Sequence, residues 1–356
     1  MNRPSLRAVG LRLAIVVPVA AGVVALLWWR GPDWHAVADA FAAVRWQWVV
    51  VAIALNLASV LVRALAWQTV IRAAMPPPQP RYSLTFSAFS VGLFANAVLP
   101  GRIGELARVA VLTRKFPGRK GLWATLVATV FAHRVFDIVP VILLVVYVLV
   151  TAKIPAWALT ALGGAIGLGI ALFAFAFAAA RRHHLSVPAE GLGAVRRLVT
   201  MARNGLGVMH DPLPAVVAVG CQCLGWLCQL FAVWTTMRAF DIHAPVPAAG
   251  LVLLLMNVVT VFPLWPGNVG LLQAAIALPL VSYGVSKAHG IAYGFGLQAI
   301  EASVGIGVGL IFLGKEGLSF AMLRVMPDAS QAELEDGPRG EDERRDAEPE
   351  RASLSG

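Results

Sequence analysis

Three charged residues, Arg102, Glu105 and Arg108, interrupt one of the most apolar parts of the chain. They follow Pro100 and Gly101, a pair that breaks regular backbone. A helix that starts after Gly101 directs its free N–H groups and its positive dipole end toward this break, where a phosphate or carboxylate would bind. Spacings of three and six residues place the charges on roughly one helix face. The alternative is that they only neutralise one another at a membrane–water boundary.

A second group of polar side chains lies further along the chain. His133, Arg134 and Asp137 fall within about one helical turn, so Arg134 and Asp137 can pair. His133 either titrates near neutral pH or makes a structural hydrogen bond to a backbone carbonyl. We expect Arg134 to contact Glu105 or an anionic head group. Glu301 is an acid near mid-membrane and needs a distant partner.

Weaker candidates are neutral or lie nearer the membrane surface. Arg63 either snorkels to the predicted inner interface or faces the interior. We find no nucleophile–base–acid arrangement, metal-ligand spacing or P-loop, so the sequence predicts no catalytic residue, cofactor or metal site. The predicted substrate-binding residues are Asn96, Gly101, Arg102, Glu105, Arg108, His133, Arg134, Asp137, Asn268, Gln273, Gln298 and Glu301.

The composition requires a membrane. Of 356 residues, 58% are hydrophobic and 13% are charged, with a mean hydropathy of +0.74. A soluble protein of this size could not bury so much apolar surface. The basic residues flank apolar segments, as the positive-inside rule requires, so we expect no nucleic-acid partner. Cys221, Cys223 and Cys228 share one apolar segment and are predicted to be reduced, buried thiols.

Long apolar segments predict about six spanning helices, over residues 13–29, 46–71, 121–150, 157–180, 215–240 and 291–313. Residues 30–35 are expected to form a short outer loop. Two further segments, 83–113 and 248–283, are each broken by Pro-Gly. The halves of the first are 17 and 12 residues long, or roughly 25 and 18 Å, which is too short for a hydrocarbon core about 30 Å thick. Both segments therefore predict re-entrant helical hairpins that line a protein interior.

The loop charges orient these elements. Basic residues flank the first hairpin on both sides, so it opens to the cytoplasm, whereas the second opens to the outside. Both chain termini are expected in the cytoplasm. Residues 1–326 form the transmembrane domain. Residues 327–356 carry ten acidic and four basic residues, and they are expected to form a disordered cytoplasmic tail.

The two halves of the transmembrane part resemble each other. LPGRIGELARVAVL, residues 99–112, aligns with WPGNVGLLQAAIAL, residues 265–278. The loop charges give the two halves opposite orientations, which predicts an inverted repeat with units of about 46–150 and 215–313. Broken helices in matching positions of inverted repeats are typical of a transport site at the repeat interface. The alternative is that P-G-x-x-G occurs twice by chance in a Gly- and Pro-rich chain.

Three motifs carry a resemblance to a known family: N-A-x-L-P-G-R-x-G-E-x-x-R at residues 96–108, H-R-V-F-D at 133–137 and P-G-x-x-G at 266–270. Over about residues 10–315 the chain resembles the flippase-like transmembrane domain of lysylphosphatidylglycerol synthases and their stand-alone relatives. The resemblance implies a multi-pass protein of the bacterial inner (cytoplasmic) membrane that moves an amphiphilic lipid between leaflets.

The chain also departs from the family pattern. His133 stands where the family more often has Glu. A Glu is usual where Gln273 stands, and an Arg is frequent where Gln298 falls, which is consistent with two partners that changed together. The soluble aminoacyl-transfer domain of the synthases is not among these residues, so we expect no lysyl-lipid synthesis.

The sequence therefore predicts an all-α polytopic membrane protein that translocates a lipid. The expected substrate is an anionic phospholipid or a polyprenyl- or terpenoid-linked lipid. One alternative is a membrane-embedded lipid-modifying or glycosyl-transferring enzyme, with Glu105 or Asp137 as its acid–base group. Another is a scaffold for a lipid biosynthesis pathway that docks enzymes through residues 327–356. Homo-oligomerisation and a lipid-biosynthesis enzyme partner are left open.

Overall fold

The structure is a computed structural model. It describes residues 33–98, 103–119, 121–161, 163–164, 167, 212–261 and 268–315. The predicted first helix, most of the predicted fourth helix and the predicted tail lie outside these residues. So do Gly101, Arg102 and the Pro-Gly break of both predicted hairpins.

The regular elements of the described chain are helices, which confirms the predicted all-α class. In chain order they are α2 (Trp34–Ala42), α3 (Trp46–Ala74), α4 (Tyr82–Val98), α5 (Gly104–Lys115), α6 (Leu122–Phe136), α7 (Ile138–Thr151), α10 (Pro212–Ala239), α11 (Val246–Val261), α12 (Leu271–Leu280), the 3₁₀ helix η4 (Val281–Tyr283) and α13 (Lys287–Lys315).

Four helical stretches of the described chain are long and apolar enough to cross a membrane, namely Trp46–Ala74, Leu122–Thr151, Leu213–Ala239 and Lys287–Lys315. Each has 27 to 30 residues, or about 40 Å at 1.5 Å per residue, which exceeds the hydrocarbon thickness and favours tilt. The protein is therefore a multi-pass membrane protein.

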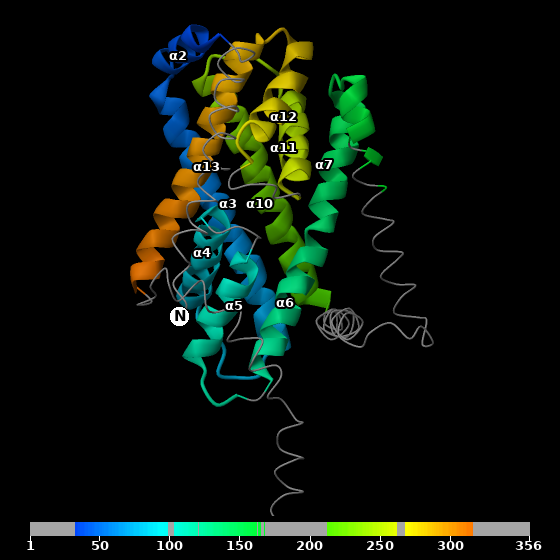
Figure 1. Cartoon of the computed structure of the whole chain (residues 1–356). Helices are drawn as coiled ribbons and strands as arrows, with labels where there is room; N and C mark the ends of the chain where they lie inside the picture. The colour runs from blue at the N-terminus through cyan, green and yellow to red at the C-terminus, as the bar shows by residue number, and fades with distance from the viewer. Residues whose placement is uncertain are drawn as a thin grey trace, which may run out of the picture.

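The remaining apolar helices form two short pairs. α4 packs against α5, and α11 packs against α12. In Figure 1, α4 and α5 lie in the lower half of the molecule, whereas α11 and α12 lie in the upper half. The long helices α3 and α10 run side by side through the centre and make the most extensive helix contact in the described chain.

Glycines bring α4 and α5 together. A Cβ atom on Gly92 would lie 2.7 Å from the carbonyl oxygen of Gly104, and a Cβ on Gly104 would collide with the carbonyl oxygen of Gly92. Asn96 Oδ1 accepts a hydrogen bond from the Gly104 amide over 2.8 Å. The backbone of α4 therefore touches the backbone of α5 where α5 begins, and an α4 side chain caps α5.

The core is divided between the two ends of the molecule. One cluster of buried apolar residues joins α4, α5 and α6 to the second half of α3. The other joins α10, α11 and α12 to the first part of α13. The contact of α3 with α10 connects the two clusters, and it includes a hydrogen bond of 2.8 Å from Ser59 Oγ to the Gly225 carbonyl.

The element boundaries differ from the prediction in detail. The predicted outer loop overlaps α2 at Trp34 and His35, because Asp33 caps the first turn by accepting from the amides of His35 and Ala36, and residues 30–32 lie outside the described part of the chain. The predicted single helix over 121–150 is confirmed as one apolar stretch, Leu122–Thr151, with a one-residue turn at Asp137 between α6 and α7. The helix expected directly after Gly101 begins at Gly104.

Candidate functional site

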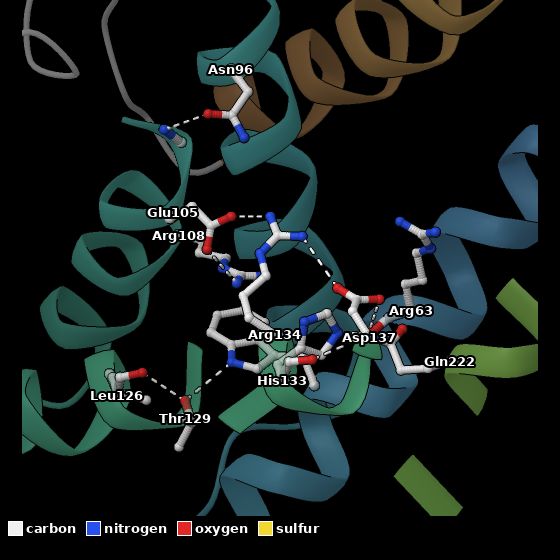
Figure 2. Close-up of polar contacts among 12 residues, drawn as sticks. Arg63, Asn96, Glu105, Arg108, Leu126, Thr129, His133, Arg134, Asp137 and Gln222 are labelled. Atoms are coloured by element: carbon white, nitrogen blue, oxygen red, sulfur yellow. Dashed lines mark hydrogen bonds and ion pairs between the residues drawn. The ribbon is translucent and has the colours of Figure 1, made fainter. Parts of the chain in front are cut away.

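Arg134 lies at the centre of a charged cluster formed by α5, α6 and the start of α7 (Figure 2). Its guanidinium donates to the carboxylate of Glu105 on one side and to Asp137 Oδ2, at 3.3 Å, on the other. The Arg134 side chain is 50% exposed, whereas those of Glu105 and Asp137 are 25% and 12% exposed. The cluster thus presents one accessible cation held between two largely buried carboxylates.

Arg108 holds Glu105 from the opposite side. Its Nη2 donates to Glu105 Oε2 over 3.1 Å, and its side chain is almost fully buried. The guanidinium lies over the rings of Trp67 and Phe89, with Cζ 4.6 and 5.4 Å from the two ring centroids. This stacking suits the planar guanidinium and would be lost with Lys. Arg108 therefore positions Glu105 from the protein interior.

Asp137 connects Arg134 to α10. Its Oδ1 accepts hydrogen bonds from Gln222 Nε2 at 2.8 Å and from Trp226 Nε1 at 2.9 Å. Gln222 also donates to the carbonyl oxygen of His133 over 3.3 Å. Both donors are buried on the spanning helix α10. They fix the orientation of the Asp137 carboxylate, which in turn orients Arg134.

His133 and Arg63 lie behind this cluster. His133 Nε2 is 3.3 Å from the carbonyl oxygen of Arg63, the contact expected of a structural histidine. Arg63 donates to Gln229 Oε1 over 2.9 Å and lies over the Trp226 ring, 5.1 Å from its centroid. Arg63 therefore faces α10 in the protein interior. Its Nε and the Nδ1 of His133 are buried and have no hydrogen-bond partner in the described part of the chain.

A small cavity opens beside Arg134. Its volume is about 30 Å³, which is room for about two water molecules. The lining residues come from α4, α5 and α6: Phe89, Gly92, Leu93, Asn96, Gly104, Glu105, Arg108 and Arg134. The cavity joins the charged cluster to the capped end of α5, so an entering polar group would meet Arg134 and Asn96 together.

The corresponding region of the second short pair is neutral. Gln273 Nε2 donates to Gln298 Oε1 over 2.6 Å, and Gln273 Oε1 accepts from the Gly270 amide, also over 2.6 Å. Asn268 donates to the carbonyl oxygen of Val259 over 3.0 Å. The two glutamines that depart from the family pattern are therefore in direct contact. They do not join the Arg134 cluster.

Glu301 belongs to neither group. It interacts with Gln229 on α10 and with the charge of Arg63 on α3. The polar neighbour of Glu301 is therefore Gln229, and Arg63 acts on Glu301 through its charge without forming an ion pair.

The expected anion site at the start of α5 is largely occupied by the protein itself. The Gly104 amide is bound by Asn96, and the amides of Leu106 and Ala107 both donate to the Ile103 carbonyl. Gly101 and Arg102 lie outside the described residues. Within these residues, the cationic group that a ligand can reach in this cluster is Arg134 on α6.

Sequence reasoning missed the contribution of α10. Gln222, Trp226 and Gln229 follow one another at spacings of four and three residues, which places them on one helix face. This polar stripe in a spanning helix was the available signal. All three contact charged groups, at Asp137, Arg63 and Glu301.

Other kinds of centre find less support. Within the described ranges, no three His, Cys, Asp or Glu side chains gather closely enough to hold a metal ion. Cys221, Cys223 and Cys228 are free thiols, as predicted, although partly rather than fully buried. The fold and the site define a polytopic helical membrane protein with an internal cluster of paired charges.

Comparison with known proteins gives the family. The sequence pattern of the lysylphosphatidylglycerol synthase transmembrane region matches residues 10–309, and the chain belongs to this family. It is also similar to a UPF0104 membrane protein of Pyrococcus horikoshii, with 28% identity over 130 residues. That alignment covers 36% of this chain and 37% of the relative. No solved structure matches the chain.

Proposed function

We propose that this protein is a lipid translocase that moves an anionic phospholipid, or a polyprenyl- or terpenoid-linked lipid with an anionic head, between the leaflets of a membrane. The observation that carries the proposal is the position of Arg134. Its half-exposed guanidinium faces a cavity inside a membrane protein and is held between the carboxylates of Glu105 and Asp137. Intramembrane ionisable groups that face a cavity mark substrate pathways.

The head group would bind by exchanging partners with the protein. Phosphate oxygens accept from a guanidinium with the same geometry as carboxylate oxygens. A phosphate that reaches Arg134 can therefore replace Glu105, which keeps Arg108 as a second partner. The cavity is too small for a whole head group, so the exchange requires α4 and α5 to separate. The lipid tails would stay in the bilayer.

An inverted repeat with transport at its interface is part of this proposal. Two hydrogen bonds between α3 and α10 join residues 166 positions apart, which is also the separation of the two Pro-Gly breaks. These pairs are Ser59 with Gly225 and Arg63 with Gln229. A two-fold axis places equivalent residues opposite each other. Such an axis between α3 and α10 would relate α4 and α5 to α11 and α12 and would permit rocking about the central contact.

The rival reading as a lipid-modifying enzyme receives less support. It requires a carboxyl group that exchanges protons with a bound substrate. Among the described residues, Glu105 accepts from Arg108 and Arg134, and Asp137 accepts from Arg134, Gln222 and Trp226. Both carboxylates are placed to hold a cation, which favours binding over acid–base chemistry.

The test is leaflet-resolved transport of fluorescent lipids in liposomes that contain the full chain. Wild type should accelerate the movement of phosphatidylglycerol relative to phosphatidylcholine, and Arg134→Gln should abolish this acceleration. Arg114→Gln is the matched control, because Arg114 is an exposed arginine in the last turn of α5. Full activity of Arg134→Gln, or equal rates for both phospholipids with no movement of a polyprenyl phosphate, would contradict the proposal. Movement of a polyprenyl phosphate alone would select the second substrate class.

A further inference from the structure

Glu301 occupies an unusual place for an acid. It lies midway between Lys287 and Lys315, the two ends of α13, and is the only acidic residue of this spanning helix. Among the described residues, no basic side chain lies within ion-pair distance of its carboxylate. An ionised carboxylate near mid-membrane is costly without such a partner, so its presence indicates function.

A neutral amide separates this acid from the nearest cation. Gln229 accepts from Arg63 over 2.9 Å and also interacts with Glu301. The amide therefore links the guanidinium to the carboxylate without a direct ion pair. Gly225 leaves room for this arrangement, because a Cβ at that position would lie 2.8 Å from Arg63 Cγ.

Arg63 also connects Glu301 to the charged cluster. Its guanidinium lies over the ring of Trp226, and Trp226 Nε1 donates to Asp137 over 2.9 Å. Arg63 is electrostatically attracted to both acids, Asp137 and Glu301, and is repelled by Arg134. The charge of Arg63 thus acts both on Asp137, which holds Arg134, and on Glu301 of α13.

We propose that Glu301 is a proton-binding carboxyl whose protonation strengthens anion binding at Arg134. The inference rests on the proposed translocase function. It names the proton as the ion whose binding is coupled to the binding of the lipid head group. A proton from the aqueous phase binds the carboxylate oxygen and cancels one negative charge, with no other reactant. Arg63 then acts more strongly on Asp137, which loosens the hold of that carboxylate on Arg134. By thermodynamic linkage, a bound anion makes Glu301 retain its proton.

Within the helices that the structure describes, Arg63 is the main electrostatic partner of Glu301. Of the helices packed against α13, α3 contributes Arg63 and α10 contributes the neutral Gln229. Neither α4 nor α12 carries an acidic or basic residue, and α12 has no titratable one. α2 carries His35 and Asp39 but lies at one end of the molecule. On α13 itself, Tyr293 is two turns away and donates to a backbone carbonyl.

The experiment measures proton uptake on ligand binding by the full chain in detergent. The probe is dihexanoyl phosphatidylglycerol, because its phosphodiester stays ionised over the whole pH range used. Calorimetry in buffers of different ionisation enthalpy gives the protons taken up per lipid bound. Wild type should take up protons, with an affinity that falls by up to tenfold per pH unit as the pH rises. Glu301→Gln should bind with no uptake and a flat pH profile.

Two further variants assign the proton. Asp39→Asn removes an exposed acid from α2 and should behave as wild type. His133→Gln removes the other titratable group near the cluster and should retain proton uptake. Equal uptake by wild type and Glu301→Gln, or loss of uptake only in His133→Gln, would overturn the proposal. Absence of binding by every variant would instead reject anion binding at Arg134, and with it the linkage to protonation of Glu301.

Infrared spectroscopy then tests the carboxyl group directly. As the pH is lowered, the ligand-free wild type should gain one protonated-carboxyl component beyond those of its other acidic residues, and the difference spectrum against Glu301→Gln should contain that component. Identical spectra of wild type and Glu301→Gln would also overturn the proposal.

Discussion

Glu105 on α5 and Arg134 on α6 form an ion pair across 29 positions of sequence. The pair ties a short, non-spanning helix to a spanning one, at the end of α5 where backbone meets backbone. The two arginines that bind Glu105 have different roles. Arg108 holds the carboxylate from the interior, whereas Arg134 remains half exposed. One arginine is therefore structural, and the other is available to a ligand.

Replacing Glu105 by Gln should destabilise the protein by about 3 kcal/mol, because the buried guanidinium of Arg108 loses its carboxylate. Thermal unfolding in detergent should show a clear loss relative to wild type. Asp39→Asn makes the same chemical change at an exposed site and should unfold as wild type does. Equal unfolding temperatures for the two variants would mean that the ion pairs of Glu105 contribute nothing to stability.

Changes at Asp137 should separate its charge from its hydrogen bonds. Asp137→Asn keeps an oxygen that Gln222 and Trp226 can donate to, but it releases Arg134 from an ion pair. We expect it to bind dihexanoyl phosphatidylglycerol several-fold more tightly than wild type. Asp137→Ala should lose about 2–4 kcal/mol of stability, because two buried donors lose their acceptor. Weaker lipid binding by Asp137→Asn would show that the carboxylate supports the anion site instead of competing for it.

The close approach of α4 to α5 gives a steric prediction. Gly104→Ala should destabilise the protein by about 1–3 kcal/mol or more, since the new Cβ meets the Gly92 carbonyl and Asn96. Gly305→Ala is the matched control. It lies within α13 and has open space around the position of a Cβ, so it should be neutral or slightly stabilising. If both variants unfold alike, the contact between Gly92 and Gly104 is looser than described.

The sequence predicted the fold well because membrane physics limits the options. Apolar length selects spanning helices, and Pro-Gly breaks divide segments into short ones. The boundary that failed, at the start of α2, depended on local side-chain chemistry. Asp33 caps a helix that composition alone did not reveal, whereas the long apolar run around Asp137 remains one stretch with a single turn residue.

The site was only partly predictable for a related reason. Charged residues in an apolar context are visible in a sequence, so Glu105, Arg134 and Asp137 could be singled out. The neutral partners on α10, Gln222 beside Asp137 and Gln229 beside Arg63, look like ordinary polar substitutions in a spanning helix. Their importance follows from long-range packing of α10 against α3 and α6, which periodicity within one helix does not encode.

The contact between Gln273 and Gln298 predicts a reciprocal exchange. Gln273→Glu alone places a carboxylate at a site that is 2% exposed and opposite an amide, and Gln298→Arg alone leaves an unpaired guanidinium. Each single variant should lose about 1–3 kcal/mol of stability. The double variant can form an ion pair over the same contact, so a double-mutant cycle of thermal unfolding should give a favourable coupling of about 1–3 kcal/mol. Additive losses would show that the two side chains do not act as a pair. Because Glu at position 273 keeps the oxygen that caps the Gly270 amide, any loss in that single variant reports the charge and not the missing cap.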